Sequence, residues 1–338
     1  MSKRISVVAV CLTALLSLAG CSDDEKPLPP LGKKAAAQAE ATCVGHEKIP
    51  EGADPTAPAV AVKIENDPAA RPQSGLENAD VVFEEVVEGG ITRFMAIYHC
   101  GDGKRVGPVR SARYDDPMIA LPFTNILAFS GANSIVAKQL QRQDMITLVE
   151  GMRGGAFYRI PEGSTSVHSV FANTEALRNL APKTRHPYPG IFPVGDLPPG
   201  AKRAKAVTIN FDKDNTIEYR WEQEAWARYE AGDKFMAKSG EQIAVPNLLV
   251  QEVLVDHSPG IVDIEGNPSP DITLKGSGRA VLFRNGKVVE GTWTFTKSSE
   301  PPTLKTKNGD AFKFSDGPVW VELVPSKKGQ VKGSFSFK

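Results

Sequence analysis

The feature that most constrains the fold is a series of short apolar runs in the C-terminal part of the chain. Each run is four to eight residues long and rich in Val, Ile, Phe, Tyr and Trp. Runs of this kind between turn residues are typical of β-strands. The runs cover residues 206–211, 217–221, 225–230, 248–255, 271–274, 280–284, 288–295 and 319–324. Between two of them, Asn285-Gly286 is a strong hairpin signal, because both residue types tolerate positive φ. We therefore expect mostly antiparallel β structure here.

The preceding part of the chain has a mixed pattern. Alternating or continuous apolar residues predict strands at 60–64, 79–88, 91–100 and 125–129, and short helices are expected at 135–140 and 173–181. Gly89-Gly90 is the expected turn of a hairpin between the second and third strands. The predicted fold class is α+β, with a mixed α/β N-terminal lobe packed against a mostly antiparallel β C-terminal lobe.

The N-terminus resembles an export signal. Lys3 and Arg4 precede an apolar stretch, residues 5–19, that is too short for a comfortable membrane span. The stretch ends in the sequence LAGC at 18–21, the pattern of a bacterial lipobox. One interpretation is a lipoprotein whose mature chain begins at a lipidated Cys21, and the other is an ordinary cleaved signal with an incidental cysteine. We favour the first, which places the protein on the extracytoplasmic face of the cell membrane, with that membrane as its partner through the lipid.

Two further cysteines, Cys43 and Cys100, remain after the signal and the lipobox are set aside. In an oxidising compartment they are expected to form a disulfide, although two buried free thiols are the alternative. They do not make a metal site by themselves, and the histidines lack the spacing of metal ligands. We expect no metal and no cofactor.

The charge balance excludes one class of partner. The chain has 40 Lys+Arg and 40 Asp+Glu residues, so its formal net charge is zero. Nothing in that balance favours nucleic-acid binding, and none is expected. A local basic surface remains compatible with the balance.

The sequence VGPVRSARYDD at 106–116 is the candidate binding segment. If the residues after Pro108 are helical, Arg110 and Arg113 share a face beside the free N–H groups of a helix start, an arrangement that suits a phosphate or carboxylate. Arg71, Arg93 and Ser111 are expected to contribute to the same ligand site.

The alternative is a set of structural ion pairs. Glu84, Glu85 and Glu88 lie on or beside the predicted hairpin, where charges on apolar strand faces are costly unless they are paired. These glutamates are the expected acidic partners of the arginines. The two interpretations are compatible if some arginines are left unpaired.

Several longer motifs carry a family resemblance. They are NDPAARPQSGL at 66–76, ADVVFE at 79–84, EGGITRF at 88–94, VGPVRSARYDD, GSGRA at 276–280 and the NGK and GTW pieces of 285–293. With these the chain resembles the YerB-like lipoprotein family of Gram-positive bacteria, a family of unknown function. The resemblance extends over about residues 58–326 and implies a lipoprotein with two adjoining domains. Proline commonly precedes the motif histidine in that family, whereas Val167 precedes His168 here.

These observations predict the organisation of the chain. The expected segments are a signal peptide at 1–20, a lipid-anchored tether at 21–57, an N-terminal domain at 58–182, a linker at 183–205 and a β-rich C-terminal domain at 206–338.

The predicted role is a cell-envelope binding or accessory module that recognises an anionic ligand, such as a lipid-linked sugar phosphate or an anionic envelope polymer. A second hypothesis is a hydrolase or transferase acting on envelope glycopolymers, with His168 and Glu84 as catalytic candidates. A third is a scaffold for an envelope protein partner. No established catalytic motif is present to separate them.

Overall fold

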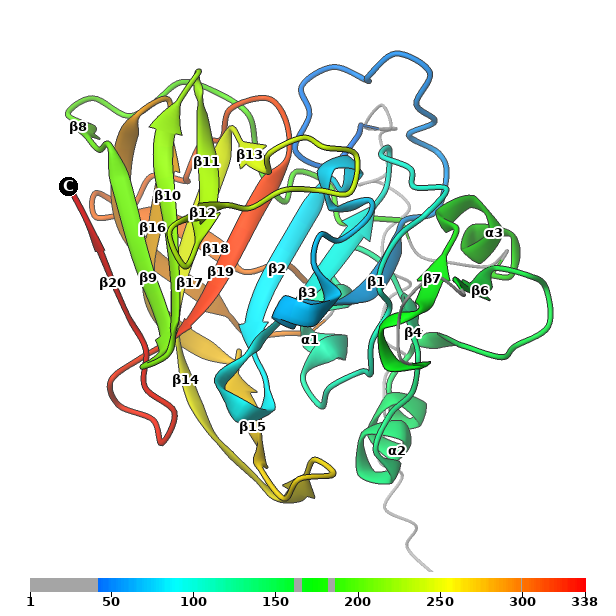
Figure 1. The fold of residues 1–338 in the computed structure, drawn as a ribbon. Helices are drawn as coiled ribbons and strands as arrows, with labels where there is room; N and C mark the ends of the chain where they lie inside the picture. Colours follow the sequence, from blue (N-terminus) through cyan, green and yellow to red (C-terminus); the bar gives the residue numbers. More distant parts are fainter. Residues whose placement is uncertain (1–41, 161–165, 182–185, 299) are drawn as a thin grey trace, which may run out of the picture. The chain divides into compact units, whose positions relative to one another are not determined.

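A computed structural model describes residues 42–160, 166–181, 186–298 and 300–338 (Figure 1). The predicted signal peptide, the lipobox and Cys21 lie outside the described residues. Within the described ranges, no helix is both long enough and apolar enough to span a membrane.

A large mixed sheet joins the two halves of the sequence. Its strands from the first half are β1 (Val60–Glu65), β2 (Val81–Val86), β3 (Thr92–Tyr98), β4 (Ile126–Phe129) and β5 (Ile146–Val149). Its strands from the second half are β14 (Asn247–Val262), β16 (Gly276–Arg284), β17 (Lys287–Phe295), β18 (Thr303–Thr306) and β19 (Val319–Pro325), with β8 (Lys202–Arg203) beside β17 and β15 (Pro268–Thr273) beside β14. The order is β18-β17-β16-β14-β19-β2-β3-β1-β4-β5, so the halves meet where β19 pairs in parallel with β2.

A smaller antiparallel sheet packs against one face of the large one. It contains β9 (Ala206–Asp212), β10 (Asn215–Glu222), β11 (Ala225–Glu230), β12 (Asp233–Lys234), β13 (Ala244–Val245) and β20 (Ser334–Phe337). Aromatic contacts join the two sheets: Trp226 meets Phe283 with ring centroids 5.5 Å apart, and Phe94 meets Phe235 at 6.0 Å. Figure 1 shows the green strands of this sheet in front of the orange and red strands of the large one.

The remaining elements are short. The helices are α1 (Asp116–Ala120), α2 (Ser134–Arg142) and α3 (Thr174–Asn179), the 3₁₀ turns are η1 (Pro68–Ala70), η2 (Leu76–Asn78), η3 (Glu88–Gly90) and η4 (Ser166–His168), and β6 (Phe157–Arg159) pairs with β7 (Val170–Ala172). Asn133 and Asn173 cap α2 and α3 with their side chains, which accept hydrogen bonds from backbone N–H groups.

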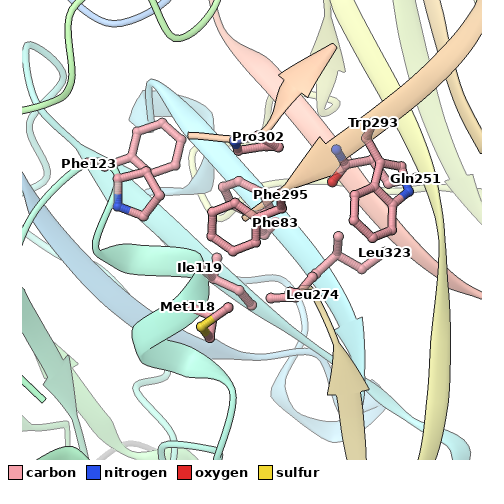
Figure 2. A pocket seen from close by; sticks show the side chains of 11 residues that line it. Phe83, Met118, Ile119, Phe123, Gln251, Leu274, Trp293, Phe295, Pro302 and Leu323 are labelled. Atoms are coloured by element: carbon pink, nitrogen blue, oxygen red, sulfur yellow. The ribbon is translucent and has the colours of Figure 1, made fainter. Parts of the chain in front are cut away.

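The face of the large sheet opposite the smaller sheet carries a small apolar cavity of about 30 Å³ (Figure 2). Phe83 of β2 and Leu323 of β19 form its floor, and Met118 and Ile119 of α1 close one side. Trp293 and Phe295 approach from β17. Gln251 is the polar side chain of a lining that is otherwise apolar.

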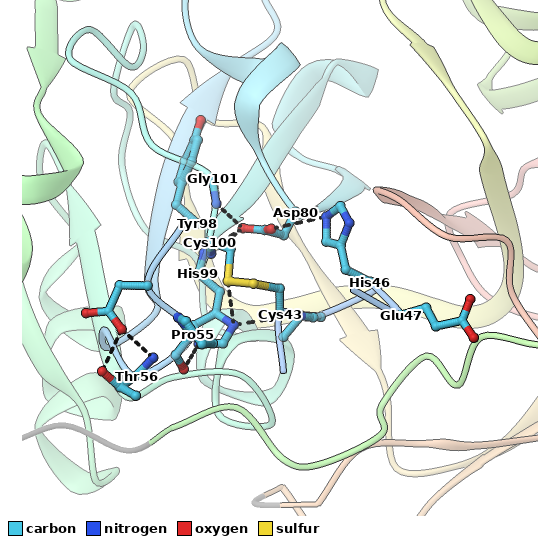
Figure 3. The surroundings of a disulfide bond; sticks show 12 residues. Cys43, His46, Glu47, Pro55, Thr56, Asp80, Tyr98, His99, Cys100 and Gly101 are labelled. Atoms are coloured by element: carbon cyan, nitrogen blue, oxygen red, sulfur yellow. Dashed lines mark hydrogen bonds and ion pairs between the residues drawn. A yellow bond between two sulfur atoms is a disulfide. The ribbon is translucent and has the colours of Figure 1, made fainter. Parts of the chain in front are cut away.

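The start of the described chain is fixed by the disulfide between Cys43 and Cys100 (Figure 3). One oxygen of the Asp80 carboxylate accepts hydrogen bonds from the backbone N–H groups of His99, Cys100 and Gly101, at 2.6, 3.1 and 3.0 Å. The disulfide is confirmed. Cys43 and its neighbour Val44 are buried, so the packed part of the chain begins before the end of the predicted tether.

The strand predictions are largely confirmed, including the C-terminal series and the hairpin at Asn285-Gly286, where φ is 51° and 62°. The hairpin at Gly89-Gly90 is also present, with Val86 opposite Thr92. The condition for Arg110 and Arg113 to share a helix face is not met, because helix α1 begins only at Asp116. The α+β class and the β-rich C-terminal part are confirmed.

Removing the disulfide is expected to destabilise the fold. The two cysteines are 57 positions apart, and closing a loop of that length in the unfolded chain corresponds to about 4 kcal/mol of stability. Urea unfolding of the wild type with and without reductant, beside the Cys43→Ala/Cys100→Ala double variant, measures this loss. The double variant is expected to have the same urea midpoint as the reduced wild type, and reductant is expected not to change that midpoint. A wild-type midpoint that reductant leaves unchanged would contradict the prediction.

Candidate functional site

The two adjacent glutamates of β2 lie on opposite faces of the large sheet, because strand residues alternate in direction. Glu84 is opposite Phe94 in the register and faces the smaller sheet. Glu85 is opposite Arg93 and faces the other side. Each glutamate therefore has a different set of neighbours, so the two cannot pair with the same cation.

Arg228 of β11 is the partner of Glu84. Both side chains are fully buried, and two guanidinium nitrogens of Arg228 donate to the carboxylate oxygens at 2.6 and 3.2 Å. A second carboxylate, Glu230, lies 2.9 Å from Arg228. Arg71, in the loop directly after η1, reaches Glu230 with a contact of 2.5 Å and also donates to the carbonyl of Asn66 at 2.8 Å. The ion pair of Arg228 and Glu84 connects the smaller sheet to the large sheet.

Lys63 of β1 is the partner of Glu85. The Lys63 ammonium is fully buried, contacts Glu85 and lies 2.7 Å from Asp116 at the start of α1. Burial raises the pKa of Glu85, although Lys63 acts in the opposite direction. Burial also raises the pKa of the neighbouring Asp115, whose carboxylate accepts a hydrogen bond from the backbone N–H of Ile272 at 2.8 Å. These groups anchor α1 and β15 to the sheet and have no exposed surface to offer a ligand.

Within the segment VGPVRSARYDD, residues 108–110 run alongside β1 as extended chain, and the segment ends in a turn that leads into α1. Val109 forms a bridge with Ile64, and its N–H donates to the carbonyl of Val170 at 2.7 Å. The N–H of Arg110 donates to the carbonyl of Lys63 at 2.9 Å. The backbone N–H groups expected to hold an anion are therefore used in sheet-like hydrogen bonds, which is why no helix forms here.

Arg113 is paired, as expected, with one of the three predicted glutamates. Its guanidinium contacts Glu88 through two nitrogens, the Nε at 3.0 Å, and the hydroxyl of Ser269 donates to the other Glu88 oxygen at 2.7 Å. Burial by itself would raise the pKa of Glu88, but Arg113 and Ser269 outweigh it and hold that pKa below its usual value of 4.5.

Arg93 is a buried cation that forms no ion pair with any carboxylate in the described part of the chain. One terminal nitrogen donates to the carbonyl of Ser111 at 3.1 Å, and the buried Nε has no hydrogen-bond partner. The pKa of Arg93 is lowered from 12.5 to about 9. Burial is the largest cause and the charge of Arg113 is the next, and Arg93 remains protonated at neutral pH.

Glu65, at the end of β1, connects Arg110 to His168. Its two carboxylate oxygens lie 2.7 Å from Arg110 Nε and 2.7 Å from His168 Nδ1. The Arg110 contact is an ion pair without an aligned hydrogen bond, because neither Arg110 Nε nor the facing Glu65 oxygen satisfies hydrogen-bond geometry. His168 is thus held by a carboxylate on one nitrogen.

A pocket of about 160 Å³ opens beside His168, and we name it the basic pocket. Its basic side chains are Arg71, Arg105, His168 and Lys238. The other described residues of its lining are Ala69, Ala70, Pro72, Pro108, Ile160 and Phe171, and none of the described lining residues is a carboxylate. Arg105 lies over the ring of Phe171, 4.6 Å from its centroid. Lys238 comes from the loop after β12, so both halves of the sequence contribute to the pocket.

Of the predicted ligand residues, Arg71 lines the basic pocket and Arg110 lies next to it through Glu65. Ser111 and Arg113 lie farther along the segment that contains Arg110, and Arg93 lies in β3; the three bond to one another or to Glu88 and do not line the pocket. Glu84 is fully buried and does not line the pocket. Among the described residues, no group of three or more His, Cys, Asp or Glu side chains is placed to hold a metal ion.

Comparison with known proteins agrees with this architecture. Residues 44–187 match the family model for the N-terminal domain of the protein of unknown function DUF3048, and residues 207–321 match the model for its C-terminal domain. The chain belongs to the DUF3048 family.

Two comparisons show that this DUF3048 chain is similar to YerB. The sequence is 28% identical over 338 residues to the Bacillus subtilis (strain 168) protein named "Putative lipoprotein YerB", covering 96% of each chain. The crystal structure of YerB protein from Bacillus subtilis matches with a TM-score of 0.70 and 27% identity, over 83% of this chain and 94% of that one. The predicted YerB-like relationship is confirmed.

Sequence reasoning missed several residues that define the site in this DUF3048 protein. Lys63 and Glu65 lie in an apolar strand, and Arg105, Arg228 and Lys238 lie outside the motifs that carry the family resemblance. One signal was available: alternation along β1 places Lys63 and Glu65 on one face, which demands a charged partner on that face. Arg228 and Lys238 gave no comparable signal.

The Arg228 network is expected to be essential for stability. Arg228→Met leaves Glu84 buried without its cation, and breaking a buried pair in this way costs about 3–5 kcal/mol. Arg220→Met is the matched control, because Arg220 is 38% exposed and solvent-exposed ion pairs such as that with Glu218 contribute little stability. Urea unfolding measures both. Similar small losses for the two variants would contradict the prediction.

The pair of Glu88 and Arg113 predicts a pH-dependent stability. A carboxyl whose folded pKa is depressed contributes stability above its unfolded pKa, and this contribution is lost as the pH falls through the folded value. Arg113→Gln is therefore expected to be destabilised at pH 7, and its difference from wild type to shrink as the pH falls below 4.5. Lys213→Gln, at an exposed pair with Asp214, is expected to show no such trend in unfolding free energy. A pH-independent difference for Arg113→Gln would refute the assignment.

Proposed function

We propose that this protein binds an anionic ligand of the cell envelope in the basic pocket and acts as a lipid-anchored binding or accessory module. The observation that carries the proposal is a pocket of about 160 Å³ whose described lining residues include four basic side chains and no carboxylate. Polar walls of one sign concentrate counter-ions in a cleft, which favours the capture of anions.

The cations of the pocket are only partly neutralised by neighbouring acids. Arg71 is paired with Glu230, and His168 is held by Glu65. Among the described residues, no carboxylate forms an ion pair with Arg105 or Lys238. Two basic side chains thus remain available to a ligand, and guanidinium and ammonium groups form charge-assisted hydrogen bonds to phosphate oxygens.

Envelope location is part of the proposal. The LAGC sequence at 18–21 follows an apolar stretch of signal-peptide length. The relative YerB carries the word lipoprotein in its name. The disulfide supports an oxidising compartment, because structural disulfides are uncommon in the cytosol. A lipid on Cys21 would hold the pocket near the outer face of the membrane, where anionic polymers and lipid-linked phosphates are found.

The proposal is tested by phosphate binding. We expect the purified protein to bind inorganic phosphate, and Lys238→Ala to weaken binding about tenfold through loss of one charge-assisted contact. Lys328→Ala removes an exposed lysine outside the pocket and is the matched control. Isothermal titration at fixed ionic strength measures the three affinities. Absence of phosphate binding, or equal affinities for the two lysine variants, would remove the basic pocket as the site.

A second candidate function rests on the pair of His168 and Glu65. A carboxylate on Nδ1 orients an imidazole and leaves its Nε2 able to act as a base, as in catalytic triads. His168 also lines the pocket. The protein would then be an enzyme that cleaves or transfers an envelope glycopolymer. Loss of turnover of labelled wall polymer in His168→Gln, with turnover retained in Lys328→Ala, would support it. An absence of turnover in the wild type would reject it.

A further inference from the structure

We infer that the ligand is a linear polymer that carries phosphate groups along its length, and that it extends from the basic pocket onto Arg110. This inference rests on the proposed function, because the pocket provides the first contact. Arg110 provides the second contact, and it lies outside the pocket lining.

Arg110 adjoins the pocket through two independent connections. The first is Glu65, whose two oxygens contact Arg110 and His168, each at 2.7 Å. The second is the backbone, because Pro108 lines the pocket and lies two positions before Arg110 in an extended segment. Residues two apart in extended chain point to the same side. A ligand group in the pocket is therefore close to the guanidinium of Arg110.

The guanidinium of Arg110 is suited to accept a ligand. Its side chain is 25% exposed, and it donates no hydrogen bond to any described residue. Its contact with Glu65 is purely electrostatic, so the terminal nitrogens are available for a phosphate oxygen without the loss of an existing hydrogen bond. Planar guanidinium groups bind phosphate through two parallel hydrogen bonds.

A cluster of three arginines lies at and behind Arg110. Arg93, Arg110 and Arg113 are within electrostatic range of one another, and Glu88 and Glu65 are the carboxylates that act on Arg93. Glu85, which is opposite Arg93 in the register, contacts Lys63. Glu65 and Glu88 each already contact a different arginine, which leaves Arg93 without an acidic partner in the described chain. An anion at Arg110 reduces the repulsion among the three guanidinium groups.

Phosphate fits this arrangement better than carboxylate does. One bidentate arginine satisfies both oxygens of a carboxylate, whereas a phosphate presents more acceptor oxygens than one side chain can fill. The pocket brings together four basic side chains around about 160 Å³, which exceeds the need of a single carboxylate. A second phosphate on the same chain then reaches Arg110, and binding both raises the affinity through the effective concentration of the second group.

The experiment compares inorganic phosphate with linear polyphosphate at constant ionic strength, using isothermal titration of the whole protein. For the wild type, polyphosphate is expected to bind at least about a hundredfold more tightly than phosphate, the lower end of the multivalent gain. Arg110→Gln is expected to lose about tenfold in polyphosphate affinity and to bind phosphate like the wild type. Arg110→Lys keeps the charge and is expected to recover part of the loss.

Arg279→Gln is the matched control, because Arg279 is 39% exposed, has an acidic partner in Glu290 and lies outside the pocket. The change in polyphosphate affinity of this variant measures the effect of losing one positive charge outside the site. Urea unfolding of every variant confirms that the comparison is made between folded proteins. Polyglutamate of similar length is the third ligand, and it is expected to bind more weakly than polyphosphate.

The outcomes separate this inference from the proposed function. If inorganic phosphate fails to bind, the proposed function itself is rejected. If phosphate binds but polyphosphate gains nothing, or if Arg110→Gln loses no more than Arg279→Gln, the pocket stands and the extension onto Arg110 is overturned. Polyglutamate binding as tight as polyphosphate would overturn the assignment to a phosphate polymer.

Discussion

The parallel pairing of β19 with β2 is the interaction on which the rest of the structure depends. It inserts a strand from the end of the sequence beside a strand from its beginning, with Val319 opposite Val81 and Leu323 opposite Glu85. The two family domains therefore share one sheet. The smaller sheet, which carries Arg228, and the loop that carries Lys238 are positioned against the N-terminal motifs only because of this pairing.

Buried charge follows directly from that arrangement. Glu84 on one face of β2 meets Arg228, and Glu85 on the other face meets Lys63. Such pairs add little net stability compared with apolar packing, yet each charge is costly without its partner. We interpret them as determinants of register: a shift of β2 by one position would exchange the two glutamates between faces and separate both from their cations.

The same geometry divides the arginines into two groups. Arg113 is neutralised by Glu88, and Arg71 is tied to Glu230 while still lining the basic pocket. Arg110 and Arg93 retain donors without aligned acceptors. The sequence left open whether the arginines form structural ion pairs or a ligand site. The structure shows for each arginine separately whether it has an aligned acidic partner. Of Arg93 and Arg110, the latter lies next to the basic pocket through Glu65, and our proposal places the ligand in that pocket because of its basic lining.

The sequence alone predicted most of the longer strands, the turn at Asn285-Gly286 and the family. Period-two alternation and Asn285-Gly286 are local signals, and local conformational preference is enough to read them. The sequence did not reveal the conformation of the segment after Pro108. Its N–H groups donate to carbonyls of β1 and of Val170, so they are not used in a helix. The sequence did not reveal the partner of Glu84 either, because Arg228 lies 144 positions away and charge pairing depends on which faces of the sheet meet. Only the tertiary structure decided which cations are neutralised and which remain to line a pocket.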